Sequence, residues 1–216
     1  MCSCEGFRRH FFCEKIVSLT SRKSKIEKNM EKQLHPEWSY GAVLYEMNVR
    51  QLTAEGTLRA AAARLAFLRD LGVDAVWLMP VYPIGRTNRK GSLGSYYSIS
   101  DYCAVNPEMG DMADFDAFVE EAHRLGMKVL LDWVANHTAR DARWIAERPA
   151  ARHERDDTGA PAVPWDWTDT AKLNYANRDV WRAQADAMEF WVTRHAVDGF
   201  RCDMAMLVPA EFWYWR

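Results

Sequence analysis

Two charged side chains near the end of the chain have the types and spacing of a catalytic ion pair. Arg201 and Asp203 stand two residues apart in the segment Gly199-Phe200-Arg201-Cys202-Asp203, which has the pattern of a short buried strand. Side chains alternate between the two faces of a strand, so this spacing directs both toward the same side. The guanidinium favours the ionised form of the carboxylate. An ionised aspartate at a strand end suits a nucleophile or an ion-pair site.

A second group of polar residues follows another apolar segment. Residues 128–132 predict a strand, and Asp132, Asn136 and His137 stand at and beyond its end. Taken alone, the group also fits a turn in which Asp132 and Asn136 hold the backbone. If the two segments are adjacent parallel strands, however, their polar ends face one pocket, and that arrangement favours a functional site.

The elements that would position these residues alternate between strand and helix. Apolar segments predict strands at residues 42–47, 75–79, 128–132 and 199–203. Helical spacing predicts helices at residues 57–71, 111–125 and 179–195, with another opening at Pro209. Apolar strands separated by helices indicate an α/β fold with a parallel sheet covered on both faces. No glycine-rich phosphate loop follows the first strand, so a (β/α)8 barrel is favoured over an open nucleotide-binding sheet.

Composition excludes several classes of protein. The chain has 216 residues with an ordinary balance of 49% hydrophobic and 27% charged residues, enough for one large domain. A net charge of −2 argues against nucleic acid or an anionic membrane surface as a partner. No apolar run is long enough to span a bilayer. The first residues lack the pattern of a secretory signal, and five scattered cysteines do not indicate a disulfide framework, so we expect a cytoplasmic location.

Four sequence blocks resemble the α-amylase family, glycoside hydrolase family 13, and the resemblance extends from about Trp38 to the end of the chain. The first block resembles the family's second strand, and the next follows that strand. The third and fourth match two conserved regions of the family, the last of which ends in its nucleophile. The blocks are residues 72–80, 97–110, 132–137 and 199–203.

The resemblance implies a role for each candidate residue. Asp203 would be the nucleophile that forms a covalent glycosyl-enzyme, and Arg201 would hold it ionised and oriented. His137 would hydrogen-bond the sugar before the scissile bond, and Tyr97 would stack on that sugar. Asp132 would be structural, fixing the loop that carries His137.

A long segment, residues 138–174, would form a loop over the active site after the third strand. Loops of this length in compact domains are usually functional. Trp165 and Trp167 in this segment could stack on sugar, although packing of the loop explains them equally well.

The chain departs from the family at two places. Met206 and Leu207 replace a common Lys-His pair after the nucleophile, which removes a side chain that often touches the next sugar. Calcium-binding members use an asparagine at the position of Asn136 together with an aspartate where Lys172 stands. Because Lys172 brings a cation in place of an anionic ligand, we expect no metal and no cofactor.

The domain organisation predicted from these blocks has two parts. Residues 1–37 would be an N-terminal extension, either disordered or upstream of a true start at Met30. Residues 38–216 would be a truncated catalytic barrel with only its first four βα units. Unpaired strand edges and an open apolar interior would then favour self-association.

The second catalytic carboxylate is expected to be missing. Retaining glycosidases need two carboxyl groups roughly 5–5.5 Å apart, and the family's acid is a glutamate after the fifth strand. Glu211, just after Pro209 at a helix start, is no substitute. We therefore expect a piece of a retaining α-glycosidase for α-glucans or maltooligosaccharides, inactive alone and ended by a truncated gene model or a frameshift. Two alternatives stay open: a non-catalytic sugar-binding remnant, and a half-barrel that completes itself by self-association.

Overall fold

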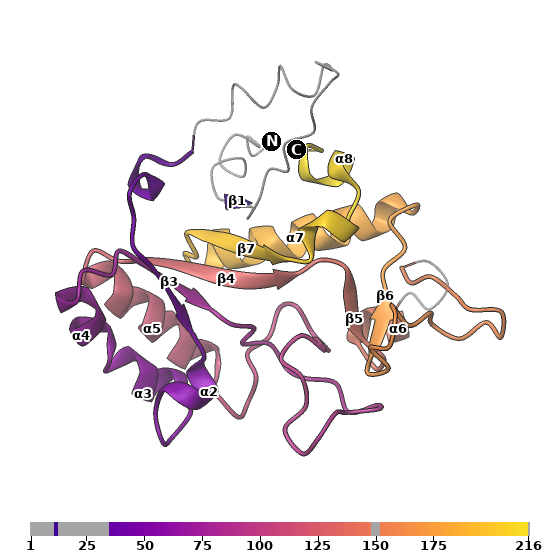
Figure 1. Ribbon diagram of the computed structural model, residues 1–216, viewed down its shortest axis with the longest axis horizontal. Helices are drawn as coiled ribbons and strands as arrows, with labels where there is room; N and C mark the ends of the chain where they lie inside the picture. Colours follow the sequence, from indigo (N-terminus) through magenta and orange to yellow (C-terminus); the bar gives the residue numbers. More distant parts are fainter. Residues whose placement is uncertain (1–10, 13–34, 148–151, 216) are drawn as a thin grey trace.

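A parallel sheet forms the centre of the protein (Figure 1). The structure, a computed structural model, describes residues 11–12, 35–147 and 152–215. The strands lie in the order β1-β7-β4-β3-β2, and each neighbouring pair is parallel. Their bounds are Phe11–Phe12 for β1, Leu44–Met47 for β2, Ala75–Leu78 for β3, Lys128–Val134 for β4 and Gly199–Asp203 for β7.

The predicted α/β class and all four predicted strands are confirmed. In this sheet β2, β3, β4 and β7 lie side by side in the order in which they occur along the chain, as a barrel requires. The described strands form an open sheet, so closure into a barrel stays a prediction. The strand β4 continues two residues beyond its predicted end, which places Asp132 inside the strand and not at its tip.

Helices cover the sheet and follow the predicted positions closely, with one difference. In Figure 1, α3 and α4 lie beside α5 at one end of the sheet, while α7 runs along β4 and β7. The predicted helix at 57–71 is wrong as a single element, because a tight turn at Ala63-Arg64 divides it. The amide of Arg64 donates to the carbonyl of Ala61 at 2.9 Å, a spacing tighter than that of an α-helix. The helices are α2 Val49–Leu52, α3 Leu58–Ala62, α4 Leu65–Asp70, α5 Met112–Arg124 and α7 Arg178–Arg194.

Side-chain caps begin the two longest helices. Asp111 accepts from the amide of Asp114 at 2.9 Å, and Asp114 accepts in return from the amide of Asp111, which forms a capping box for α5. Asn177 accepts from the amide of Asp179 at the start of α7. These caps satisfy amides that have no partner inside the helix.

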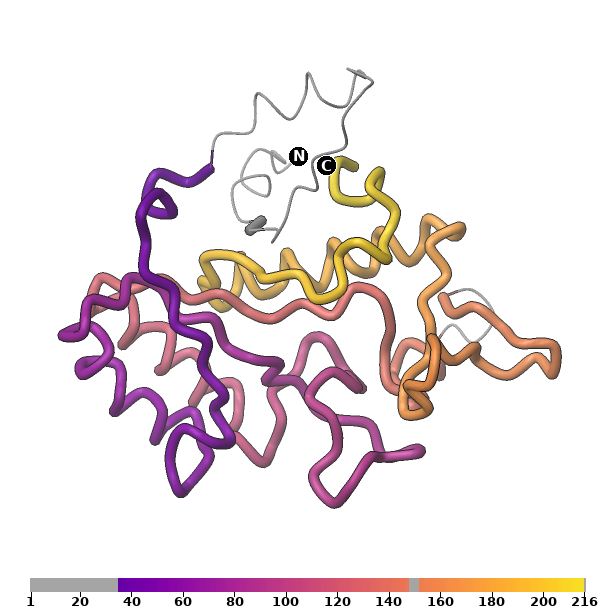
Figure 2. The backbone as a smooth tube through the Cα atoms, viewed as in Figure 1, coloured from indigo at the N-terminus to yellow at the C-terminus, as the bar shows by residue number. Residues whose placement is uncertain are grey.

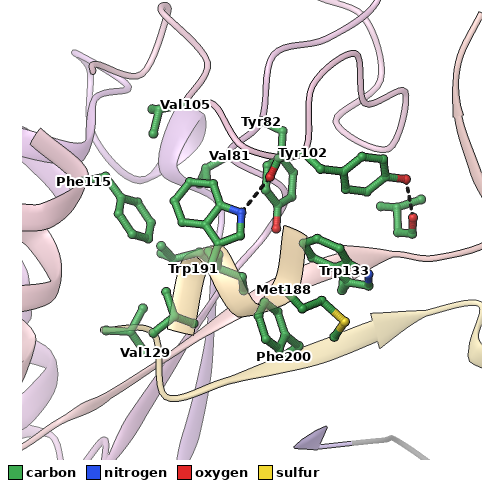
Figure 3. Packing of buried hydrophobic residues seen from close by; sticks show 14 of the residues in the cluster. Val81, Tyr82, Tyr102, Val105, Phe115, Val129, Trp133, Met188, Trp191 and Phe200 are labelled. Carbon is green, nitrogen blue, oxygen red and sulfur yellow. Dashed lines mark hydrogen bonds between the residues drawn. The ribbon is translucent and has the colours of Figure 1, made fainter. Parts of the chain in front are cut away.

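Aromatic side chains fill the space between the sheet and its helices (Figure 3). Trp133 of β4 packs edge-on against Phe200 of β7 with ring centres 5.3 Å apart. The indole of Trp191 donates to the carbonyl of Tyr102 at 2.7 Å, which fixes α7 against the loop after β3. Large buried aromatic surfaces of this kind dominate the stability of a core.

The segment 138–174, predicted as a long loop, contains ordered elements. The strand β5, His137–Ala139, pairs antiparallel with β6, Thr170–Lys172, and α6, Arg143–Glu147, lies between them in sequence. This hairpin lies near the loop that follows β3 (Figure 2). The amide of Ala139 donates to the carbonyl of Ile99 at 2.7 Å. Both loops therefore leave the carboxyl ends of the strands and pack on each other.

The remaining described elements are short. They are η2 Glu37–Ser39, η3 Ala205–Leu207 and α8 Ala210–Trp213. None of the described helices combines the length and apolar character needed to cross a membrane. Most of the predicted N-terminal extension, residues 1–37, and the proposed start at Met30 lie outside the described residues.

Candidate active site

Arg201 joins two carboxylates at the carboxyl end of the sheet. Its Nη1 atom lies 2.9 Å from Asp203 Oδ1 and 3.2 Å from each carboxylate oxygen of Asp132. Strand register explains the contact, because Asp132 stands opposite Arg201 in the β4–β7 pair. Its guanidinium also lies over the ring of Trp77, 4.7 Å from the centroid. The guanidinium is thus held on three sides.

Asp132 lies at the base of the site and is completely buried. Its Oδ2 atom accepts from the indole of Trp77 and from the hydroxyl of Tyr97, each at 3.2 Å. Burial raises the pKa of Asp132 to about 7; Arg201 opposes this rise and the charge of Asp203 adds to it. Asp132 therefore organises the side chains beneath the site, whereas the sequence suggested that it would fix the loop of His137.

Two tyrosines hold that loop instead. The hydroxyl of Tyr102 lies 2.6 Å from the carbonyl of Val134 and 2.8 Å from that of His137. The hydroxyl of Tyr175 donates to the carbonyl of Ala135 at 2.7 Å. Neither residue was recognised from the sequence, because each is far from the loop in the chain.

Asp203 ends β7 at the mouth of the site, with its side chain 14% exposed. The pKa of Asp203 lies above its ordinary value, because burial raises it more than the neighbouring Arg201 guanidinium lowers it. Loss of hydration on burial is therefore the larger influence on the pKa of Asp203. Directly after Asp203 the backbone turns through Met204, whose φ of 49° is unusual for a residue with a side chain. This turn ends the strand at Asp203.

His137 is buried and neutral at neutral pH. Burial lowers the pKa of His137 to about 4, although the nearby charge of Asp169 opposes the change. One ring nitrogen, Nδ1, lies 3.2 Å from the side-chain amide nitrogen Nδ2 of Asn136. With this amide donating to Nδ1, the neutral ring carries its proton on Nε2 and adds no charge to the cavity.

The side chains around Asp203 enclose a cavity of about 330 Å³, within the range of small-molecule sites. Among the predicted site residues, the cavity brings together Tyr97, His137, Trp167 and Asp203. It also has five lining residues that the sequence analysis missed, namely Lys90, Ser95, Asp169, Thr170 and Met204. Their place depends on how the two loops pack, for which the sequence carries no local signal.

The two predicted loop tryptophans differ in position. Trp167 lines the cavity, with its ring centre 5.2 Å from that of His137. Trp165 is 63% exposed and packs against Trp167 with ring centres 4.8 Å apart. Trp167 is therefore placed to contact a ligand in the cavity, while Trp165 supports it from outside.

A larger hollow of about 550 Å³ lies beside the hairpin and is lined by Asn136, Lys172 and Glu211 among others. Lys172 forms an ion pair with Glu154 at 2.9 Å. No cluster of three or more potential metal-ligating side chains occurs in the described part of the chain. Asp203 does not line this hollow, so the smaller cavity is the better candidate for chemistry.

Comparison with known proteins identifies the family. A sequence model of the catalytic domain of α-amylases matches residues 23–168, more than half of the chain. The chain belongs to the α-amylase family. As a member of this family it is related to glycoside hydrolases, including an α-glucosidase of Culex pipiens with 29% identity, which covers 77% of this chain and 34% of the relative.

Individual relatives of this α-amylase family chain support the assignment. The α-amylase MalA of Haloarcula japonica is 38% identical over 82% of this chain and 27% of the relative. A maltosyltransferase of Salinibacter ruber that acts on α-1,4-glucan and maltose-1-phosphate is 32% identical over 83% of this chain and 31% of its own length. The chain thus spans less than a third of either relative.

A solved structure shows the same fold. The α-amylase of Lactobacillus plantarum has 43% identity and a TM-score of 0.76, covering 80% of this chain and 40% of that one. The amylase-family sheet described above is therefore part of a larger fold in this relative.

Proposed function

We propose that this chain forms the nucleophile half of a retaining α-glycosidase, acting on α-glucans or maltooligosaccharides, whose complete fold is the (β/α)8 barrel. The supporting observation is the position of Asp203, which lies 2.9 Å from Arg201 and lines the same cavity as His137 and Tyr97. In this proposal the Asp203 carboxylate attacks the anomeric carbon of a glucose residue. A carbon–oxygen bond forms and the glycosidic bond breaks, leaving a covalent glycosyl-enzyme.

The neighbouring side chains would prepare this attack. Arg201 holds one oxygen of Asp203, and Asp132 holds Arg201 from the opposite side. Neutral His137 would contact sugar hydroxyls without adding a charge. Tyr97, held by Asp132, would contact the sugar ring. This arrangement positions the nucleophile before substrate binds.

The acid that protonates the leaving oxygen is not supplied by the described cavity. Among the described residues, the carboxylates lining it are Asp169 and Asp203, and Asp169 forms an ion pair with Lys90. Glu211 lines the other hollow. We therefore expect no turnover of an aryl α-glucoside by the 216-residue chain; hydrolysis that disappears in Asp203→Asn would contradict this expectation.

The nucleophile can be tested separately with an α-glucosyl fluoride, because fluoride leaves without protonation by an acid. Asp203 would displace fluoride from the anomeric carbon, and 2-fluoro substitution of the sugar would slow loss of the adduct. Mass spectrometry should show one added glycosyl group on the peptide containing Asp203. Asp157→Asn, which changes an exposed carboxylate, should label normally, whereas Asp203→Asn should not. A label on another residue, or none at all, would contradict the proposal.

Sugar binding without catalysis is the second candidate. The cavity beside Trp167 and Tyr97 combines aromatic and hydrogen-bonding groups, a usual composition for a carbohydrate site. Calorimetry with maltotriose should then give a measurable heat even if labelling fails. Absence of both binding and labelling would exclude both candidates.

Self-association is a further proposal that rests on the open sheet. The strand β2 has one described neighbour, β3, and Val43 and Leu44 along this edge are 52% and 39% exposed. Exposed apolar strand edges favour pairing between chains. Sedimentation velocity should detect dimers or larger species, and a strictly monomeric chain would contradict this proposal.

A further inference from the structure

Lys90 is a cation on the wall of the cavity that contains Asp203. It lies in the loop that follows β3, and among the described residues that line this cavity it is the one with a positively charged side chain. Its side chain is 50% exposed, which leaves room for a ligand to reach it. By contrast, the side chain of its ion-pair partner, Asp169, is only 3% exposed. The accessible member of this pair is therefore Lys90.

The ammonium group of Lys90 has unused hydrogen-bond donors. Its Nζ atom lies 3.3 Å from Oδ1 of Asp169. This distance is longer than the roughly 2.7–2.9 Å of a charge-assisted hydrogen bond. An ammonium group carries three N–H donors, and within the described ranges this ion pair is the polar contact that Nζ makes. At least two donors therefore remain for a ligand in the cavity.

The backbone on both sides of Lys90 is held in place. Before it, the side-chain amide of Asn88 donates to the carbonyl of Thr168 at 3.1 Å, which joins this loop to the segment that leads into β6. After it, Gly94 has a φ of 73°, and a Cβ atom at this position would come within 2.7 Å of Nε of Arg89. Only glycine fits this turn against the arginine. Lys90 thus reaches the cavity wall from a fixed loop.

The charges around Lys90 favour a neutral hydroxyl group over an ion. Asp169 already balances the charge of Lys90, and the carboxylate of Asp203 lines the same cavity. Two carboxylates would repel a phosphate or carboxylate group, and the ammonium group would repel a metal ion. A hydroxyl oxygen accepts a hydrogen bond from the ammonium group without bringing a charge into the cavity. The arrangement therefore suits an uncharged polyhydroxyl ligand.

We propose that Lys90 is a substrate-binding residue whose Nζ atom donates a hydrogen bond to one hydroxyl oxygen of a sugar in the Asp203 cavity. Asp169 is its positioning residue, since the backbone carbonyl of this buried residue accepts from the hydroxyl of Ser98 at 2.9 Å. This inference rests on the proposed function, because it places the sugar in the same cavity. The substrate class it selects is a neutral oligosaccharide of glucose with a free hydroxyl at one ring position, and not a phosphorylated sugar.

Calorimetry with maltose and its monodeoxy derivatives, each lacking one hydroxyl, tests this inference on the full chain. The unchanged chain should bind one derivative about tenfold more weakly than maltose, as expected for a lost hydrogen bond to a charged group. Lys90→Met should bind maltose and that derivative equally, whereas Lys90→Arg, which keeps a charged donor, should retain part of the difference. The control Arg86→Met removes an exposed cation from the same loop and should bind like the unchanged chain.

A double variant separates sugar binding from a purely structural ion pair. Lys90→Met leaves the buried carboxylate of Asp169 without its countercharge, which can destabilise the fold. Lys90→Met combined with Asp169→Asn removes both charges, and its unfolding curve should resemble that of the control. If Lys90 binds the sugar, the double variant should still fail to distinguish maltose from the derivative. If it distinguishes them as the unchanged chain does, the inference is overturned.

The remaining outcomes separate this inference from the proposed function. Equal affinity of the unchanged chain for maltose and every derivative would overturn the inference, as would tighter binding of maltose-1-phosphate than of maltose. Normal labelling of Asp203 would leave the proposed function standing in either case. If no sugar binds and Asp203 is not labelled, both fail together. If selectivity depends on Lys90 but the label lies on another carboxylate, only the role of Asp203 fails.

Discussion

Asp132 and Asp203 share one guanidinium nitrogen: Nη1 of Arg201 lies 3.2 Å from both oxygens of Asp132 and 2.9 Å from Asp203. The side chain of Asp132 is fully buried, and that of Asp203 is 14% exposed. One cation thus compensates two carboxylates of different burial. The more exposed one faces the cavity, and the other anchors the cation from below.

Replacement of Arg201 by Gln should strongly destabilise the protein. The change leaves two carboxylates without their countercharge, and loss of one partner from a buried ion pair typically costs about 3 kcal/mol or more. Urea unfolding measures the difference. Arg124→Gln is the control, because Arg124 forms a surface pair with Glu121 that contributes little to stability. Equal free energies of unfolding for the two variants would contradict the shared-cation arrangement.

Asp132 should make the protein less stable as the pH rises from about 4 to about 7. Its pKa is raised to about 7 in the fold from an ordinary value of 3.8, so the folded state binds the extra proton in this range. The stabilisation is complete below pH 4 and is lost as the pH passes 7. We expect the free energy of unfolding of the unchanged chain, relative to Asp132→Asn, to fall by about 3 kcal/mol across this range. A constant difference between the two would show that Asp132 is ionised throughout.

His153 should act in the opposite direction. Burial, aided by Arg155 and Arg152, lowers the pKa of His153 to about 4 from 6.5. Its contribution is complete above pH 6.5 and is lost as the pH falls toward 4. The unchanged chain should lose on the order of 2 kcal/mol relative to His153→Gln between pH 7.5 and 4.5. Replacement of exposed His35 by Gln is the control. If the free energies of unfolding of His153→Gln and His35→Gln depended on pH in the same way, a buried neutral His153 would be contradicted.

The two loop tryptophans should differ in their effect on sugar affinity. Trp167→Ala removes an aromatic wall of the cavity, whereas Trp165→Ala removes an exposed ring that packs behind it. We expect about a tenfold loss of maltotriose affinity for the first change and less than about threefold for the second, from the usual value of a buried aromatic contact. Fluorescence titration provides the measurement. A larger loss for Trp165→Ala would place the sugar outside the cavity.

Local sequence pattern was sufficient for the elements that carry the site. Strands β2, β3, β4 and β7 occur where apolar segments predicted them, and the register of β4 on β7 places Asp132 opposite Arg201. The single predicted helix at 57–71 was wrong, because periodicity of apolar side chains cannot detect a tight turn at Ala63-Arg64 that keeps the same face buried. Boundaries of this kind depend on packing against neighbouring elements.

The sequence by itself determined the alternation of strands and helices, the family, and the common face of Arg201 and Asp203. These follow from spacing along the chain, which sets the direction of each side chain. Only the tertiary structure decided that Asp132 lies under Arg201, that burial raises the pKa of Asp203, and that Asp169 meets Lys90 at the same cavity. Burial and contacts between distant loops depend on how the elements pack, and no local pattern of residues specifies them.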